Sequence, residues 1–464
     1  MTRPAALYLG AGCALDAQSP PSPYSLPAHH LVTHGVIVGM TGSGKTGLLT
    51  VLVEETLKNR VPVLMIDVKG DLPNLLLALQ DFRPERVEPW VEPSPDDERL
   101  IPELASAAAT ERQQALGAWG IDEKTLHEFH AQVAPRVITP GSTAGEPLHV
   151  LSMLERPTRS WDSDPSAARA SLSAGISLVL RLLGRDADPA RSREHVLLSV
   201  FAEARVKAGG SAALEALLED LAAPPIERIG ALPVDKFLSK RDRNELAAAL
   251  NALLASPSFG AWREGVALDV GEWLTPISDK TPAVIVSVAH LDDDERSLVL
   301  GVLLEEILTW VRGLSGSKRL RTLLVFDEVY GFLPPHPANP PTKRPLVALM
   351  KQARAFGVGV VVATQNPMDL DYRALSNAGL WWVGRLQTDG DRARVIEGLA
   401  SSTAGAGASA SELAELTKSL SPRWFLMRDV HAERGAQLLQ PRWAMSLLRG
   451  PMTGSEIRKA REAW

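Results

Sequence analysis

The chain has 464 residues, too many for one ordinary hydrophobic core, so we expect two or three domains. Hydrophobic residues make up 45% and charged residues 22%, which is typical of a globular protein and excludes a disordered or fibrous one. The 55 acidic residues exceed the 49 basic ones, so a protein that binds nucleic acid through its overall charge is also excluded.

The N-terminal part of the chain predicts a cytoplasmic protein. A single cysteine, Cys13, excludes an internal disulfide and a cysteine-based metal site, and it favours a reducing compartment. The first residues, MTRPAALYLGAGCALDAQSPP, lack the apolar run of a secretory signal. No run of about 18 apolar residues follows, so we expect no segment that spans a membrane.

Eight short apolar runs, each bounded by turn residues, predict buried strands. They are GVIVG (35–39), VPVLMIDV (61–68), RVITP (136–140), AVIVSVAH (283–290), RTLLVFDE (321–328), GVGVVVATQ (357–365), LWWVGRLQ (380–387) and RWFLMRD (423–429). Unbroken Val, Ile and Leu runs are typical of strands buried on both faces of a parallel sheet. Helical segments alternate with them, which predicts an α/β fold with a mostly parallel, doubly wound sheet.

Three segments depart from this alternation. Residues 160–262 are rich in Ala, Leu and Arg, show helical apolar spacing and contain no convincing strand, so we predict an all-helical insertion between strands of one sheet. Residues 334–345 contain six prolines, which predicts a loop. Residues 400–412 are small and polar, which predicts a linker or mobile loop.

The first predicted strand leads into a glycine-rich loop and then a helix. Gly39, Gly44, Lys45 and Thr46 have the spacing G-x-x-x-x-G-K-[ST] of a phosphate-binding loop, here of a P-loop NTPase. We expect Lys45 on the β- and γ-phosphates and the Thr46 hydroxyl on Mg²⁺. The sequence therefore predicts a site for ATP and Mg²⁺ with the nucleotide-binding residues Gly39, Met40, Thr41, Gly42, Ser43, Gly44, Lys45 and Thr46.

Two later strands end in residues suited to hydrolysis. RTLLVFDE ends in an acidic pair, and we expect Asp327 to bind Mg²⁺ through water and Glu328 to orient and deprotonate the attacking water. The second acid favours hydrolysis over binding alone. Gln365 ends the next strand at the sheet edge where ligands bind, so its amide is a candidate sensor of the γ-phosphate. A turn formed by Gln-Asn-Pro is the alternative.

The segment IDVKGDL leaves Asp67, Lys69 and Asp71 at the same predicted edge. One interpretation is a contact with the nucleotide site or with a neighbouring subunit. A solvated loop is the other, and the residues alone favour neither.

Several segments together resemble the HerA-like ATPases of the HerA–FtsK superfamily, most of all large bacterial ATP-binding proteins with a HerA-type motor core. They are GMTGSGKTGLL, MIDVKGDLPNL, VFDEVYGFLPP, NPPTKRPLVALMKQARAFGVGVVVATQNPMDLDY, SNAGLWWVGRLQTDGDRARV, ASPSFGAWREGVALDV and QPRWAMSLLRGPMT. The likeness covers nearly the whole chain in order, so it is more specific than any single motif. It implies a ring-shaped hexamer with ATP sites between subunits, which moves double-stranded DNA through its pore.

The resemblance also implies roles for single residues. Lys45 with Thr46 would be the Walker A pair, Asp327 with Glu328 the Walker B pair, and Gln365 the sensor. Arg354 matches the position from which an arginine reaches the γ-phosphate of the neighbouring subunit, and a surface arginine is the alternative. Arg385 competes for the role of nucleotide-facing arginine. An arginine supplied in trans would link hydrolysis to assembly.

On this interpretation the chain has five parts. They are an N-terminal segment (1–34), the first part of the ATPase core (35–159), the helical insertion (160–262), the second part of the core (263–440) and a C-terminal segment (441–464). HerA itself carries a further domain before its motor, and only about 34 residues precede the first predicted strand here. Large relatives also continue beyond the region that resembles residues 441–464.

The predicted function is an ATP-driven, helicase-like DNA translocase that works with a nuclease or another effector in DNA processing or antiphage defence. Lys343, Arg344 and Lys351 are the candidate DNA contacts, because a ring would repeat them six times; a loop that packs subunits together is the alternative. Two other functions stay open. One is a nucleotide-controlled assembly switch without translocation, and the other is a polypeptide-pumping ATPase of the secretion type.

Overall fold

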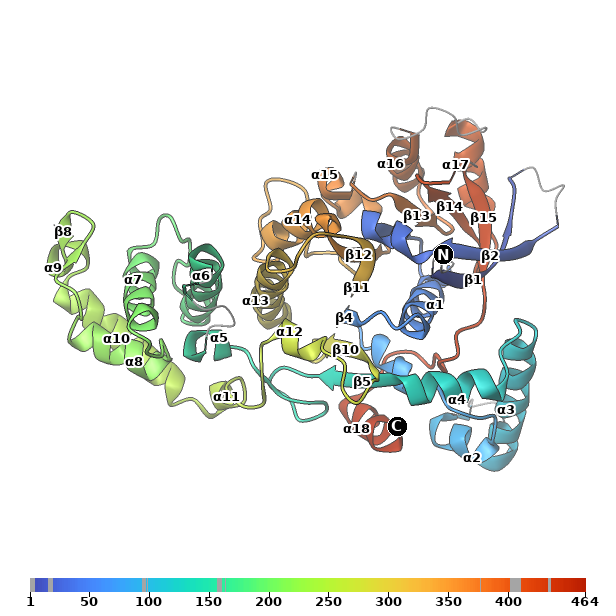
Figure 1. Cartoon of the computed structure of the whole chain (residues 1–464), viewed down its shortest axis with the longest axis horizontal. Helices are drawn as coiled ribbons and strands as arrows, with labels where there is room; N and C mark the ends of the chain where they lie inside the picture. The colour runs from blue at the N-terminus through green and yellow to red at the C-terminus, as the bar shows by residue number, and fades with distance from the viewer. Residues whose placement is uncertain are drawn as a thin grey trace.

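The computed structural model describes residues 5–15, 20–93, 97, 99–156, 161–162, 164–375, 377–400, 410–432 and 435–464. Most of the loop predicted at 400–412 lies outside these residues. An eleven-stranded sheet runs through the body of the molecule with helices on both of its faces (Figure 1). The strand order is β2-β1-β15-β14-β13-β3-β12-β11-β4-β10-β5.

The predicted parallel sheet is confirmed by seven neighbouring strands. In spatial order they are β13 (Leu380–Val383), β3 (Gly35–Val38), β12 (Phe356–Thr364), β11 (Ser317–Asp327), β4 (Val63–Asp67), β10 (Thr281–Ser287) and β5 (Val133–Ile138). Val36 and Val38 of β3 pack into the core on one face, while Ile37 packs into the core on the other. Both faces are covered by helices, which is why these strands are unbroken apolar runs in the sequence.

Four antiparallel strands extend the sheet beyond β13. They are β14 (Phe425–Asp429), β15 (Gln437–Pro441), β1 (Ala6–Cys13) and β2 (Ser22–Pro27). The prediction that the first strand begins at residue 35 is therefore wrong. In β1 the residues Gly10, Gly12 and Cys13 interrupt the apolar alternation, and β2 contains two prolines, so neither strand has the pattern of a buried one.

Helices cover the two faces of the sheet in separate layers. On one face lie α1 (Lys45–Lys58), α3 (Ile101–Gly117), α4 (Glu123–Gln132), α18 (Gly454–Ala463) and the 3-10 turn η2 (Leu72–Leu77). On the other lie α13 (Asp293–Arg312), α14 (Lys343–Gln352), α15 (Tyr372–Leu375), α16 (Asp389–Ala400) and α17 (Ala410–Ser419). A doubly wound sheet of this kind presents its functional loops at the carboxyl ends of the parallel strands.

A helical arm extends from one side of the sheet, within the range 160–262 (Figure 1). Its main helices are α6 (Pro165–Leu182), α7 (Arg193–Lys207), α8 (Leu214–Ala222) and α10 (Lys240–Leu254). The arm joins the body where α6 packs against α13. It also contains a minimal hairpin, β7 (Arg228–Ile229) with β8 (Leu232–Pro233), which was not predicted.

The remaining elements are short. They are η1 (Ala28–Thr33), α2 (Pro84–Val87), η3 (Glu88–Trp90), β6 (Leu148–His149), α5 (Ser152–Glu155), α9 (Val234–Phe237), α11 (Pro257–Gly260), β9 (Val266–Ala267), α12 (Val270–Trp273), η4 (Ala353–Ala355) and η5 (Pro367–Asp369). Over the described part of the chain, no helix combines the length and the apolar character needed to cross a membrane.

Candidate functional site

The glycine-rich loop joins the buried strand β3 to α1, as predicted. Gly44 is the N-cap of α1 and has φ 95°, a left-handed conformation that favours glycine. A Cβ at Gly39 would lie 2.6 Å from Ser43 Oγ, so the loop also closes too tightly there for a side chain. No side chain caps the N-terminus of α1. Its backbone N–H groups are therefore available to an anion such as phosphate.

Lys45 is folded back along this loop. Its Nζ donates hydrogen bonds to the carbonyl oxygens of Gly39 (2.6 Å) and Met40 (3.1 Å). Burial lowers the pKa of Lys45 to about 8, while the carboxylates of Glu328 and Asp327 act in the opposite direction. To bind a phosphate, the ammonium group has to exchange the two carbonyl oxygens for phosphate oxygens.

Asp327 ends β11 among other carboxylates. The strand register puts it beside Asp67 of β4, which is fully buried and accepts hydrogen bonds from Ser287 Oγ (2.6 Å) and Gly70 N (2.9 Å). Burial raises the pKa of Asp67 to about 6. Burial and the neighbouring carboxylates, Asp67 first, raise the pKa of Asp327 to about 7. This part of IDVKGDL is thus buried structure and not a solvated loop.

Glu328 is held in place by several partners. It has φ 56°, which is uncommon for a residue other than glycine and is a strain often found at functional sites. Its Oε2 accepts hydrogen bonds from Lys69 Nζ (2.6 Å) and Gln365 Nε2 (2.9 Å), and its Oε1 accepts weaker ones from Thr364 Oγ1 and Gln365 N (both 3.3 Å). Lys69 therefore contacts the candidate nucleotide site, which was one of the two interpretations of the segment IDVKGDL.

Gln365 connects this acid to the phosphate loop. While its Nε2 donates to Glu328, its Oε1 accepts a hydrogen bond of 2.6 Å from Thr41 Oγ1. One side-chain amide thus spans from the loop after β3 to the residue after β11. A change at the phosphate loop can in this way be passed directly to Glu328.

The two candidate arginines lie at opposite ends of the parallel strands. Arg385 is at the phosphate loop, where its carbonyl oxygen accepts from Met40 N (2.9 Å) and its Nε lies 3.3 Å from Met40 Sδ. Arg354 lies in η4, immediately before the nine-residue strand β12, whose far end carries Gln365. A strand of that length spans about 30 Å. Arg354 cannot reach the phosphate loop of its own chain.

Comparison with known proteins gives one family match. Residues 15–129 match the family model for the central domain of the helicase HerA, so this part of the chain is similar to that domain. The matched residues include the phosphate loop and end before β10, β11 and β12.

Solved structures share the fold at low sequence identity. VirB4 of Thermoanaerobacter pseudethanolicus superposes with a TM-score of 0.53 and 13% identity, over 95% of this chain and 97% of VirB4. The plasmid coupling protein TrwB, solved with ADP and Mg²⁺, has a TM-score of 0.48 and 13% identity, over 92% of this chain and 89% of TrwB. No curated protein sequence matches the chain.

The side chains at the phosphate loop and at the end of β11 fit a bound Mg²⁺. Asp327 and Thr46 are the candidate protein ligands, and Mg²⁺ commonly takes only one or two ligands from the protein, with water and phosphate oxygens as the rest. The carboxylates of Asp67, Asp71 and Glu328 all raise the pKa of Asp327, so the charge of a divalent cation would be compensated there. Among the described residues, no group of three acidic, histidine or cysteine side chains forms a protein-only metal site.

One residue at the phosphate loop was missed by the sequence analysis. Arg423 precedes β14 and donates its backbone N–H to Ser43 O (3.0 Å). It has φ 63°, and its guanidinium carbon lies 3.4 Å from the ring centroid of Trp443. Arg423 begins the predicted strand run RWFLMRD and Trp443 lies in the segment QPRWAMSLLRGPMT, but neither segment indicates that the two residues meet at the loop.

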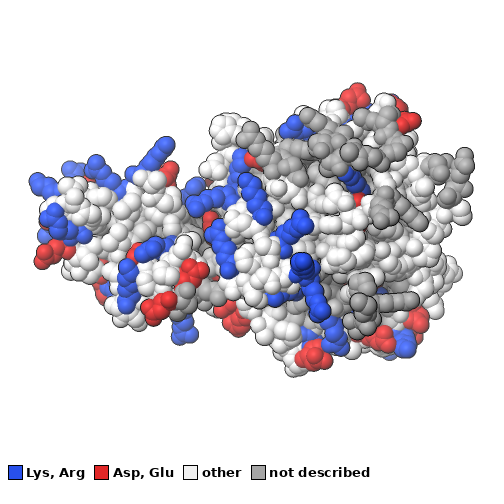
Figure 2. All heavy atoms as spheres, turned by 45° about the horizontal axis from the view of Figure 1, so that its top comes forward, with Lys and Arg blue, Asp and Glu red and all other residues white. Residues whose placement is uncertain are grey.

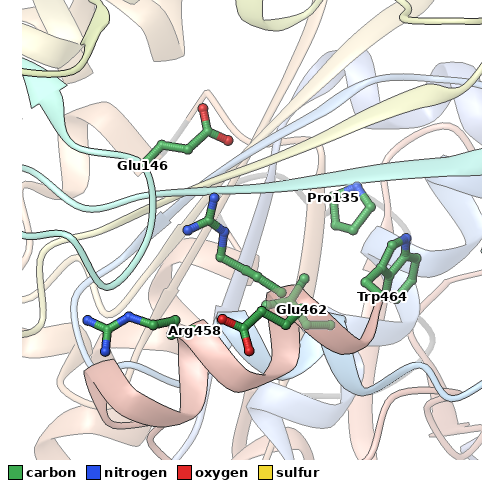
Figure 3. Close-up of a pocket in the computed structure, with 7 residues that line it drawn as sticks. Pro135, Glu146, Arg458, Glu462 and Trp464 are labelled. Atoms are coloured by element: carbon green, nitrogen blue, oxygen red, sulfur yellow. The ribbon is translucent and has the colours of Figure 1, made fainter.

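A cavity also lies away from the phosphate loop. It has a volume of about 330 Å³, and the residues that line it include Arg458 and Glu462 of α18, Trp464, Pro135 of β5 and Glu146 (Figure 3). Charges of both signs line it, and the phosphate loop does not contribute to it. We therefore assign the nucleotide to the loop and not to this cavity.

The raised pKa of Asp327 predicts how the stability of the nucleotide-free protein depends on pH. The unfolded carboxyl loses its proton near 3.8, whereas the folded one keeps it until about pH 7. Between these values the folded state binds more protons, so a rise in pH favours unfolding. Asp327→Asn should therefore raise the melting temperature by several degrees at about pH 8 and hardly at about pH 4.5.

Thermal unfolding of both proteins without nucleotide across this range measures the effect. Asp279→Asn is the matched control, because the side chain of Asp279 is 95% exposed. A difference between Asp327→Asn and the wild type that stays constant with pH would contradict the prediction.

Proposed function

We propose that the chain is the ATPase subunit of a ring-forming, cytoplasmic motor that moves double-stranded DNA. The observation that carries the proposal is the chain of contacts from Thr41 through Gln365 to Glu328, which connects a phosphate loop to an acid suited to activate water. ATP with Mg²⁺ would supply the reactive γ-phosphate. TrwB, of related fold, was solved with ADP and Mg²⁺ and with a non-hydrolysable ATP analogue.

Each side chain has a defined task in this proposal. Lys45 moves from the carbonyl oxygens of Gly39 and Met40 to the phosphates. Gln365 detects the occupied loop through Thr41 and repositions Glu328. Glu328 takes the proton of the attacking water once its ion pair with Lys69 has loosened, because its Oε2 is then available to the water.

The position of Arg354 calls for a second copy of the chain. Since it lies at the amino end of the parallel strands, it can serve in hydrolysis only if that edge meets the carboxyl edge of a neighbour. Such a contact joins two different surfaces and generates a ring when the rotation closes. We therefore propose a homo-oligomer, a hexamer by the resemblance, with Arg354 in trans and Arg385 in cis.

Mixing two inactive variants tests the role of Arg354 in trans. Arg354→Ala is expected to abolish hydrolysis and retain ATP binding, because the phosphate loop stays intact. Adding Lys45→Ala protein should restore part of the activity, since some interfaces then combine an intact loop with an intact arginine. The readout is ATP turnover against the mixing ratio. Complete inactivity at every ratio would overturn the role in trans.

A basic surface at the same edge is the candidate contact for DNA. Its residues are Arg312, Lys318, Arg319, Arg321 and Lys351, none of which forms an ion pair with a described residue. Basic side chains also gather over the central part of the view in Figure 2. Of the residues first considered, Lys351 belongs to this surface and Arg344 is exposed nearby, whereas Lys343 is paired with Asp371 at 3.2 Å. Phosphate contacts from this surface would not depend on the DNA sequence.

Double-stranded DNA is expected to raise ATP turnover, and changing Lys318, Arg319 and Arg321 to Glu should remove that increase. For each lost phosphate contact, the slope of log DNA affinity against log salt concentration should become less steep by about one. Changing the exposed Lys236, Lys240 and Arg241 of the helical arm to Glu is the matched control. Equal turnover with and without DNA across a salt series would favour an assembly switch without translocation.

The effector of the motor is a proposal drawn from the resemblance alone. A nuclease or another effector of DNA processing or antiphage defence fits a motor of this kind. A polypeptide substrate remains the third candidate, since VirB4 has a related fold.

A further inference from the structure

A small cavity adjoins the phosphate loop on the side of the first turn of α1. Its volume is about 180 Å³, and its walls include Gly47 and Leu48 of α1 together with Arg423, Trp443 and Leu448. The last three come from segments near the end of the chain. A nucleotide whose phosphates lie on the loop has to place its sugar and base beside the loop. This cavity is therefore within reach of the base.

Arg423 is fixed firmly at the wall of the cavity. Besides the backbone hydrogen bond to Ser43 O, its Nη2 donates to Pro441 O at 2.9 Å. The guanidinium carbon lies over the Trp443 ring at 3.4 Å from its centroid. A planar cation thus lies over an aromatic ring, so the two groups already form a stacked pair at the wall of the cavity.

A buried ion pair of the preceding residue holds Trp443 in position. The next residue toward the N-terminus, Arg442, is fully buried and pairs with Glu54 and Glu55 of α1 at 2.9 Å each. Its Nη1 also donates to the carbonyl oxygen of Trp443 at 2.7 Å. Trp443 itself is 47% exposed and Leu448 38% exposed, although both are large apolar side chains. These apolar surfaces are therefore pre-positioned and only partly covered.

We propose that Arg423, Trp443 and Leu448 form the subsite for the base of the bound nucleotide, and that they select purines by stacking. The inference rests on the proposed ATP binding at the phosphate loop. The walls offer an aromatic ring, a guanidinium group and aliphatic carbons, but no side-chain amide or carboxylate. Such a subsite favours the large purine rings over pyrimidines and distinguishes adenine from guanine only weakly.

Tripolyphosphate distinguishes binding at the base subsite from binding at the phosphate loop, because it has the phosphates of ATP without sugar or base. With Mg²⁺ present, ATP and GTP should bind the wild type similarly and more tightly than CTP or tripolyphosphate. Trp443→Ala should weaken ATP binding about 5- to 100-fold and leave tripolyphosphate unchanged. Trp443→Phe should restore most of the ATP affinity, and Trp119→Ala, which changes a half-buried tryptophan outside the cavity, should have no effect. Titration calorimetry gives all these dissociation constants.

A second variant keeps the test valid if Trp443→Ala does not fold. A Cβ at Gly47 would meet only Leu448 Cδ1, at 4.0 Å, so Gly47→Leu can be accommodated and would fill the cavity. It should weaken ATP and spare tripolyphosphate. Equal weakening of both ligands, or of neither, in the folded variants would overturn the base subsite. If instead Lys45→Ala left ATP binding intact, the proposed function itself would fail, and the two failures are distinct.

Discussion

Glu328→Gln is expected to lower ATP turnover about 100- to 10,000-fold while ATP binding is retained. The substitution removes a base without changing its shape. Glutamine can still occupy the strained position after β11 and make neutral hydrogen bonds with Gln365 and Thr364. What it loses is the ability to take a proton from water. Steady-state turnover and the dissociation constant of ATP, measured on the same preparation, separate the two effects.

The control for this experiment is Glu111→Gln, which changes an exposed glutamate of α3 with no recorded partner among the described residues. It should leave turnover unchanged. A trapped ATP state is also expected to hold the assembly together, so Glu328→Gln should elute as a larger species with ATP than without it. Normal turnover in Glu328→Gln would show that another group activates the water.

Arg442→Met is expected to destabilise the protein by about 3–5 kcal/mol, because it leaves Glu54 buried without a cationic partner and Glu55 with Lys58 alone. Arg442 and Glu54 have no exposed side-chain surface, and Glu55 has 4%. Glu54 also accepts hydrogen bonds from Met445 N and from Ser446 N and Oγ, at 2.8–3.0 Å. The network thus attaches the C-terminal segment to the helix that follows the phosphate loop. Denaturant unfolding measures the loss.

A matched pair of variants distinguishes desolvation from simple loss of contacts. Combining Arg442→Met with Glu54→Gln and Glu55→Gln removes all the buried charges, so much of the lost stability should return. Arg60→Met breaks an exposed ion pair with Asp279 and should cost at most about 1 kcal/mol. If Arg442→Met were as stable as Arg60→Met, the buried network would not hold the C-terminal segment.

The position of the candidate site was largely predictable, because its residues follow strands with a strong local signal. Buried runs such as LLVFD end where the parallel strands also carry the phosphate loop, so proximity followed from topology alone. The register of β11 with β4 then explains why Asp327 and Asp67 are neighbours. In contrast, the contact of Lys69 with Glu328 depends on one side-chain rotamer, and two interpretations of Lys69 remained open.

The lateral strands β1 and β15 and the residues of the proposed base subsite were not predictable in the same way. β1 and β15 pair with each other across almost the whole chain, and their small or polar residues give no strand periodicity. In the sequence, Arg423 and Trp443 are an ordinary cation and an ordinary aromatic residue. Only the fold brings them to Gly44. Residues that meet only through tertiary contacts have no shared pattern in a single sequence.

The pairing of β1 with β15 has a consequence for synthesis of the protein. β1 ends at Cys13, and its partner begins at Gln437. At about 5–20 residues per second, the ribosome leaves the first strand without that partner for roughly 20 to 80 seconds. During this time residues 10–13 of β1, which pair with β15 in the finished fold, lie on an open strand edge. The nascent chain, more than the folded protein, is therefore the species that needs protection by chaperones.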